Sequence, residues 1–167
     1  MPRIPSGKGR YAVSIVTLKN EELTVKISTL GAEIQSIEDK NRVERLWQGD
    51  PAIWKGRAPI LFPVAGGFKD DGYELDGQWY GMPKHGFAKT EEWAVESADE
   101  EEATFLLTAQ KPGFPFRYEF RAVFSLGEQI RSHEIRRSAA VSNHQHFRRA
   151  CGHIDRRTVQ TLAHLTF

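Results

Sequence analysis

The sequence predicts a mainly β protein, built as an antiparallel sandwich or barrel, and three observations favour this fold class. Short runs of alternating apolar and polar residues recur over residues 11–126, which is the pattern of half-buried strands. Turn signals such as Asp76-Gly77 follow one another closely between these runs. No segment carries the apolar period of a long helix. Many short strands joined by close turns are typical of packed antiparallel sheets.

The N-terminal part predicts an antiparallel meander. Residues 1–10 contain Pro, Gly and scattered basic residues, and we expect them to form a flexible lead-in. A strand pattern begins at Tyr11. Two more strands are expected over residues 23–27 and 32–37, where apolar residues recur between polar ones. A polar turn over residues 20–22 separates the first two strands, Gly31 ends the second, and a second polar turn over residues 39–42 follows the third.

Aromatic and polar residues gather between Leu46 and Phe87. This stretch holds three of the four Trp residues, namely Trp47, Trp54 and Trp79. Flat rings beside a few hydrogen-bonding groups suit a sugar, because a pyranose has an apolar face and a rim of hydroxyls. The alternative is an ordinary sheet core with Pro and Gly corners, and composition alone leaves both interpretations open.

Arg57 and His85 are the candidate site residues of this stretch. Arg57 lies among apolar residues, in a segment that Pro59 and Pro63 restrict to a sheet edge or bulge, and such segments suit a binding rim. His85 follows the predicted Asp-Gly hairpin in a loop, where Gly86 would let the backbone approach a ligand. A salt-bridging Arg57 and a solvated His85 are the ordinary alternatives.

The character of the chain changes after Leu126. Strands are expected over residues 93–96, 104–109 and 118–126, and the last of these shows the cleanest alternation. Residues 128–167 then hold 7 Arg, no Lys and 3 acidic residues, and five of the six His lie there. Neither a strand nor a helix period persists. We therefore expect residues 127–167 to form an atypical Arg/His-rich tail that is disordered, frame-shifted or left by a truncated gene.

Composition excludes several functional classes. The chain has 40% hydrophobic and 27% charged residues, as soluble globular proteins do. Its net charge of +1 and its lack of a long apolar run argue against nucleic-acid and membrane partners. A metal site made of His144, His146, Cys151 and His153 matches no familiar ligand spacing, so no metal is expected. A single Cys and the absence of an apolar leader predict a cytoplasmic location.

Several blocks in the same order resemble a known family. They are Trp-Lys-Gly-Arg-Ala-Pro-Ile-Leu-Phe-Pro at 54–63, Tyr-Glu-Leu-Asp-Gly at 73–77 and His-Gly-Phe-Ala at 85–88, with Trp93 behind them. Their order and spacing are similar to those of the aldose 1-epimerase (galactose mutarotase) family, in its LacX-like branch. The resemblance covers residues 13–126 and then fades. It implies a galactose mutarotase-like antiparallel β-sandwich that is incomplete at the C-terminus.

The resemblance also implies an isomerase that interconverts the α and β anomers of a free hexose without a metal or cofactor. A base takes the proton of the C1 hydroxyl while an acid protonates the ring oxygen, and the opened ring closes on its other face. By position, Arg57 corresponds to the Arg that binds sugar oxygens and His85 to the first active-site His. Phe62 and Phe87 would line the pocket.

Two departures from the family pattern affect catalysis. The family's acid is a second His, for which His153 is the candidate here, with Ile154 in place of the family's Pro. The family's catalytic Glu lies further towards the C-terminus than this sequence extends. We therefore expect a weak or inactive aldose 1-epimerase that takes an aldohexose. The alternative is a catalytically inactive carbohydrate-binding or truncated fragment, whose exposed sheet edges would allow self-association.

Overall fold

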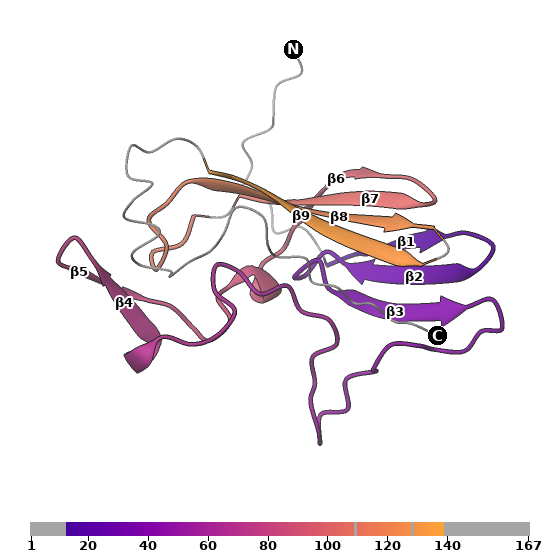
Figure 1. Cartoon of the computed structure of the whole chain (residues 1–167), viewed down its shortest axis with the longest axis horizontal. Coiled ribbons are helices and arrows are strands. Elements are labelled where there is room, and N and C mark those ends of the chain that lie inside the picture. Colours follow the sequence, from indigo (N-terminus) through magenta and orange to yellow (C-terminus); the bar gives the residue numbers. More distant parts are fainter. Residues whose placement is uncertain (1–12, 109, 128, 139–167) are drawn as a thin grey trace, which may run out of the picture.

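Two antiparallel sheets that face each other form most of the molecule, and a separate β-hairpin lies at one end (Figure 1). The computed structural model describes residues 13–108, 110–127 and 129–138. Two short 3₁₀ turns, η1 (Lys69–Asp71) and η2 (Ala88–Thr90), precede and follow the hairpin along the chain. The predicted mainly β, antiparallel sandwich is confirmed.

The first sheet contains β1 (Ile15–Lys19), β2 (Leu23–Ser28) and β3 (Ile34–Asp39) in that order. Both strand pairs are antiparallel, so the predicted meander is confirmed. Successive side chains of a strand face opposite sides of its sheet, and for this reason Val25 and Ile27 of β2 are both fully buried. The expected lead-in over residues 1–10 and the strand start at Tyr11 lie outside the described residues.

The second sheet contains four strands in sequence order. They are β6 (Ala94–Ala98), β7 (Glu102–Leu107), β8 (Tyr118–Leu126) and β9 (Ile130–Ser138). The alternation predicted for β8 is confirmed, because Phe120, Ala122 and Phe124 on one face are at most 3% exposed.

Strand β9 corrects one expectation about the C-terminal segment. It lies within residues 127–167, where the sequence shows no lasting strand period, yet it pairs with β8 along its whole length. A strand at a sheet edge gains backbone hydrogen bonds whatever its side-chain pattern, so alternation was a poor guide here. Residues 139–167, which include His153, lie outside the described residues. Disorder or a shifted frame in that part stays a prediction.

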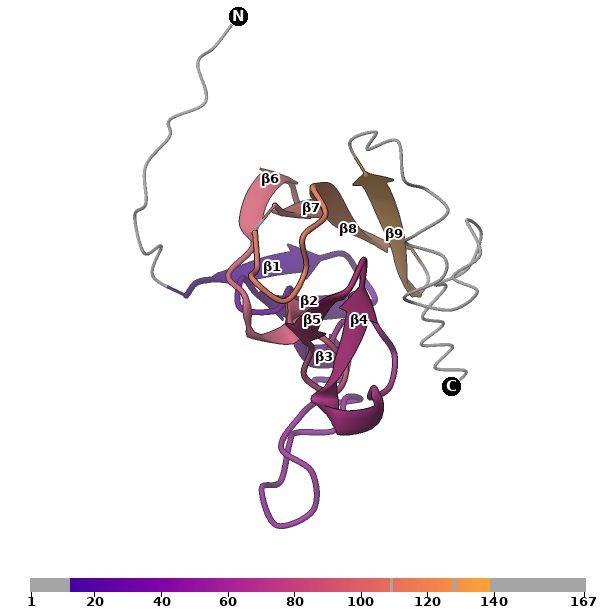
Figure 2. The ribbon, with the colours of Figure 1, turned by 90° about the vertical axis from the view of Figure 1, so that its left-hand side faces the viewer.

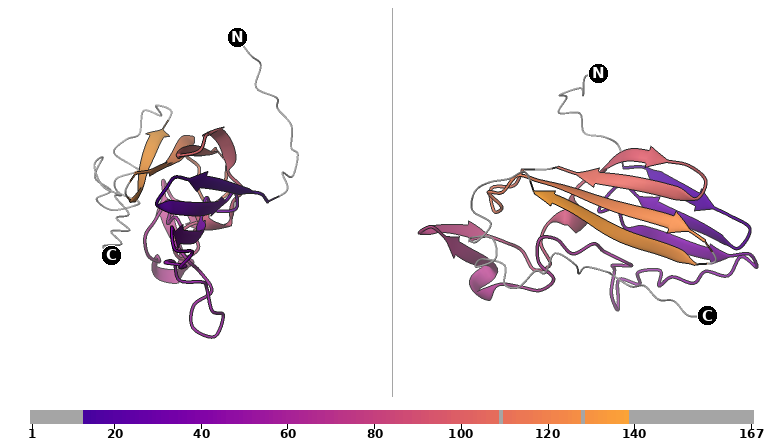
Figure 3. Two further views of the ribbon diagram at one scale, coloured as in Figure 1. Left: turned by 90° about the vertical axis from the view of Figure 1, so that its right-hand side faces the viewer. Right: turned by 45° about the horizontal axis from the view of Figure 1, so that its top comes forward.

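The core lies between the two facing sheets, whose layering is clear in the right-hand view of Figure 3. Phe105 and Phe120 from the second sheet and Leu18 from the first are fully buried in it. Trp93, just before β6, joins the layers: its backbone N–H donates to the carbonyl of Thr29 at 2.8 Å, and its ring is 1% exposed. Trp93 therefore links the segment that follows β2 to the second sheet, where its ring packs against Phe120.

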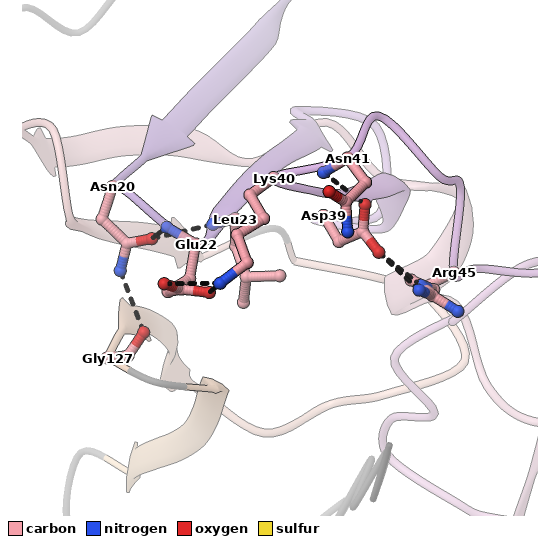
Figure 4. Close-up of polar contacts among 8 residues, drawn as sticks. All are labelled: Asn20, Glu22, Leu23, Asp39, Lys40, Asn41, Arg45 and Gly127. Atoms are coloured by element: carbon pink, nitrogen blue, oxygen red, sulfur yellow. Dashed lines mark hydrogen bonds and ion pairs between the residues drawn. The ribbon is translucent and has the colours of Figure 1, made fainter.

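Polar contacts tie the turns of the two sheets together (Figure 4). Asn20 accepts from the backbone N–H groups of Glu22 at 3.0 Å and Leu23 at 2.9 Å. Its amide nitrogen donates to the carbonyl of Gly127 at 2.9 Å. One side chain therefore shapes the β1–β2 turn and fastens it to the turn between β8 and β9.

The hairpin of β4 (Gly72–Leu75) and β5 (Gln78–Gly81) lies at one end of the sandwich, which is the end facing the viewer in Figure 2. Its turn residues Asp76 and Gly77 have φ angles of 52° and 76°. Two consecutive left-handed residues produce the tight turn that Asp-Gly favours, and the predicted hairpin is confirmed.

The described residues contain neither a membrane-spanning helix nor a cluster of metal ligands. None of their helices is long and apolar enough to cross a membrane. Their His, Cys, Asp and Glu side chains form no group of three or more that could hold a metal ion.

Candidate functional site

Arg57 is held against β3 by both its backbone and its side chain. Its N–H donates to Oε1 of Glu33 at 2.9 Å, and the N–H of Ala58 donates to the same oxygen at 3.1 Å. Its guanidinium Nη1 donates to Oε1 of Gln35 at 3.1 Å. Ala58 also forms a bridge with Ile34 in β3. The half-buried Arg57 is therefore a fixed part of the first sheet's edge.

Backbone contacts hold the segment of His85 and Gly86 in place. It adopts a left-handed conformation with φ of 68°, and its N–H donates to the carbonyl of Gly66 at 2.6 Å. The next residue, Gly86, forms a parallel bridge with Phe62. A Cβ at Gly86 would lie 2.0 Å from the carbonyl oxygen of Phe62. The glycine expected to admit a ligand is therefore required by the close approach of the protein's own backbone.

One short segment connects the two candidate residues. Arg57 immediately precedes the bridge of Ala58 to β3, and His85 immediately precedes the bridge of Gly86 to Phe62. From Ala58 to Phe62 the chain spans at most about 14 Å. Both residues thus flank the same segment. That their side chains converge on one ligand stays a prediction.

Phe62 and Phe87, the predicted pocket residues, are buried at 4% and 7% exposure. Their rings lie 5.8 Å apart at 87°, and Phe62 also packs 4.7 Å from Phe120 and 5.2 Å from Tyr118, measured between ring centroids. Burial, and to a lesser degree the charge of Glu91, raises the pKa of the Tyr118 phenol above its ordinary range. The two Phe rings are thus part of a buried aromatic cluster, and contact with a ligand stays a prediction.

The four Trp residues divide between core and surface. Trp47 and Trp54, close to Arg57 in sequence, are 40% and 50% exposed, and Nε1 of Trp47 donates to the carbonyl of Trp54 at 2.8 Å. Trp79 on β5 is 55% exposed, whereas Trp93 is buried. The interpretation of residues 46–87 as ordinary sheet core therefore does not hold for the three Trp rings of that stretch, whereas Trp93, which lies outside it, is a core residue.

Two buried polar atoms lack partners. Within the part of the chain that the structure describes, the buried side-chain nitrogen and oxygen atoms without a hydrogen-bond partner are Nε of Arg57 and Nδ1 of His85. Leaving such an atom unpaired costs about 1–3 kcal/mol, so native structures rarely do so without a reason. Both atoms belong to residues that the sequence singled out.

The sequence did not reveal Glu33 and Gln35, which accept hydrogen bonds from Arg57. A weak signal was present, because two polar residues spaced by two flank the buried Ile34 and would share a face of a regular strand. Their partner lies 22 or 24 residues away, and no local pattern reports a contact at that separation. His153, the candidate acid, lies outside the described residues.

Comparison with known proteins gives the family. The sequence model of the family described as Aldose 1-epimerase matches residues 14–165. The chain belongs to the aldose 1-epimerase family. The match continues beyond Leu126, where the resemblance was expected to fade. The protein LacX of Lactococcus lactis subsp. lactis, in its plasmid and chromosomal forms, is 38% identical over 126 residues, which are 70% of this chain and 42% of that protein.

Solved structures of this family are similar as well. A galactose mutarotase related enzyme from Lactobacillus acidophilus is 35% identical with a TM-score of 0.70, over 75% of this chain and 44% of that one. A galactose mutarotase-like protein from Lactobacillus casei ATCC 334 is 31% identical with a TM-score of 0.70, over 72% of this chain and 43% of that one. This chain thus spans less than half the length of these relatives. The recognition of the family and of its fold is confirmed.

Proposed function

We propose that this chain binds a free aldohexose at Arg57 and His85 and takes part in the interconversion of its α and β anomers. The family membership supports the reaction class. The observation that carries the site is the pair of buried, unpartnered nitrogens, Nε of Arg57 and Nδ1 of His85. A sugar hydroxyl both donates and accepts, so it can pair with either atom.

Each residue has a chemical role in this proposal. The Arg57 guanidinium donates to sugar oxygens, including those on which negative charge develops as the ring opens, and such preorganised donors lower the barrier. His85 exchanges a hydrogen bond with a neighbouring hydroxyl and fixes the orientation of the ring. The exposed rings of Trp47 and Trp54 offer apolar faces on which a pyranose can stack.

Proton transfer needs an acid and a base beyond these two residues. His153 remains the proposed acid. We assign no residue of these 167 as the base. One positioned proton-transfer group is typically worth about 10²- to 10⁴-fold in rate, so we propose that this chain alone is a weak epimerase. A cytoplasmic location, no nucleic-acid partner and self-association through open sheet edges belong to the same proposal.

Polarimetry of freshly dissolved α-D-glucose or α-D-galactose tests the reaction. We expect the full 167-residue chain to speed mutarotation above the buffer rate. Arg57→Ala and His85→Ala should each remove most of that increase, at least tenfold, because a hydrogen bond to a charged group contributes about 1.5–3 kcal/mol. Lys55→Ala, an exposed neighbour of Arg57, serves as the control.

The second candidate is a carbohydrate-binding protein without turnover, because the two unpartnered nitrogens of Arg57 and His85 account for binding but supply no base for proton transfer. Titration of the chain with D-galactose separates the two. A rate equal to that of buffer together with saturable binding supports the second candidate. A rate equal to that of buffer without binding contradicts both.

A further inference from the structure

A chain of polar contacts runs from Glu33 through Gln35 to the Arg57 guanidinium. The Gln35 amide nitrogen lies 3.2 Å from Oε2 of Glu33 and 3.2 Å from the Glu33 carbonyl oxygen, and it donates to both. The amide oxygen of Gln35 accepts from Nη1 of Arg57 at 3.1 Å. All three residues are half-buried, so water screens these contacts less than it would at the surface.

The charges at the two ends fix the orientation of the Gln35 amide. A flipped amide would point its N–H groups at the guanidinium and its oxygen at the carboxylate, and both contacts would become repulsive. The negative charge of Glu33 therefore orients Gln35, and the amide oxygen of Gln35 in turn orients Arg57.

The contact at Nη1 also fixes the direction of Nε. A guanidinium is planar, so holding one terminal nitrogen restricts the plane in which the Nε–H bond lies. Glu33 holds the backbone N–H of the same residue through Oε1, so Arg57 is held both at its backbone and at the end of its side chain. Nε itself is buried and has no hydrogen-bond partner among the described residues.

We propose that Glu33 and Gln35 are positioning residues that hold the Arg57 Nε–H group in the direction of a bound sugar oxygen. The claim that the acceptor is a sugar rests on the proposed function above. The claim that the two residues order the guanidinium does not depend on it. Neither residue need touch the sugar.

Gln35→Leu tests the proposal, since Leu is of similar size but has no amide. The ¹⁵Nε–¹Hε NMR signal of Arg57, assigned by its loss in Arg57→Lys, reports the order of the guanidinium without any sugar. We expect a single ordered signal in the parent and an averaged or broadened signal in Gln35→Leu. The Kd for D-galactose should rise about 3- to 10-fold, which is the usual effect of one lost hydrogen bond.

Two matched variants complete the design. Glu33→Gln keeps an oxygen for the backbone N–H groups but removes the charge that orients Gln35, so it should disorder the same signal. Gln48→Leu removes an exposed amide that donates to the Gln35 carbonyl and leaves Arg57 untouched, so it should change neither the signal nor the Kd.

A double-mutant cycle between Gln35 and Arg57 distinguishes a role of Gln35 in orienting Arg57 from general damage to the sheet. In an Arg57→Lys background, where no planar group remains to be oriented, Gln35→Leu should change the Kd less than about twofold. An equal loss in both backgrounds, or an Arg57 signal that stays ordered in Gln35→Leu, overturns the inference. If Arg57→Ala leaves sugar binding unchanged, the proposed function fails instead, and the NMR signal still decides the positioning claim.

Discussion

The two candidate residues are held in place by different means. Arg57 depends on the side chains of Glu33 and Gln35, which reach it across 22 to 24 residues of sequence. His85 depends on backbone atoms, through the carbonyl of Gly66 and the bridge of Gly86 to Phe62. Substitutions of Glu33 or Gln35 should therefore change the position of Arg57. The backbone around His85 should tolerate a change of the His85 side chain, but not a side chain added at Gly86.

The largest expected effect comes from Gly86→Ala. The new Cβ would lie 2.0 Å from a carbonyl oxygen of Phe62 that also accepts from the N–H groups of Phe87 and Ala88, at a φ of 68° that costs most L-residues about 1–2 kcal/mol. We expect a loss of more than about 3 kcal/mol in the free energy of unfolding, measured by urea denaturation. Gly66→Ala meets no atom within 4 Å and should be nearly neutral. Equal losses of unfolding free energy in Gly86→Ala and Gly66→Ala would contradict the claim that close backbone contact at Gly86 holds this segment.

The next effect is expected for Glu33→Ala. The variant leaves the half-buried N–H groups of Arg57 and Ala58 without their acceptor, which should lower the free energy of unfolding by about 1–3 kcal/mol in urea denaturation. Glu38→Ala is the matched control, because Glu38 lies on β3 and its carboxylate has no hydrogen bond among the described residues. A neutral Glu33→Ala would mean that the backbone holds Arg57 after all.

A smaller effect on stability is expected for His85→Gly. Glycine adopts the left-handed conformation without strain, which offsets its greater loss of backbone entropy. We expect an unfolding free energy within about 1 kcal/mol of the parent, together with loss of sugar binding by calorimetry. A large loss of stability would instead make His85 a structural residue.

The smallest effect is a pH dependence at Asp39, another residue that acts through its side chain (Figure 4). The N–H of Val43, and then the guanidinium of Arg45, hold the pKa of the Asp39 carboxyl below its ordinary value. A depressed folded-state pKa gives stabilisation that is present above the unfolded-state value of about 3.9 and is lost as pH falls through the folded-state value.

Asp39→Asn should therefore lower the Tm slightly at pH 7, and the difference should shrink towards zero as the pH falls through the lowered folded-state pKa of the carboxyl group. Thermal unfolding at pH 7 and in acid measures this, with Glu74→Gln on the exposed face of β4 as the control. If the Tm difference between the parent and Asp39→Asn persisted unchanged in acid, the loss would come from packing or hydrogen bonding and not from the charge of Asp39.

Local sequence patterns predicted the parts of the fold that local physics determines. The alternation in β8 and the Asp-Gly turn of the hairpin each depend on residues close in sequence. Strand β9 escaped prediction because its place is set by pairing with β8 rather than by its own pattern. The proposal of Arg57 and His85 came from order and spacing of motifs, but their supports at Glu33, Gln35 and Gly66 are contacts between distant parts of the chain.

The division of the Trp residues has a practical consequence. Unfolding moves the indole of Trp93 from an apolar interior into water, whereas the other three indoles are already 40–55% exposed. A red shift of the fluorescence emission should therefore report opening of the core chiefly through Trp93. Quenching without a large shift would come from the exposed rings, of which Trp47 and Trp54 lie close to Arg57 in sequence, so unfolding and occupancy of the proposed site should change the emission in different ways.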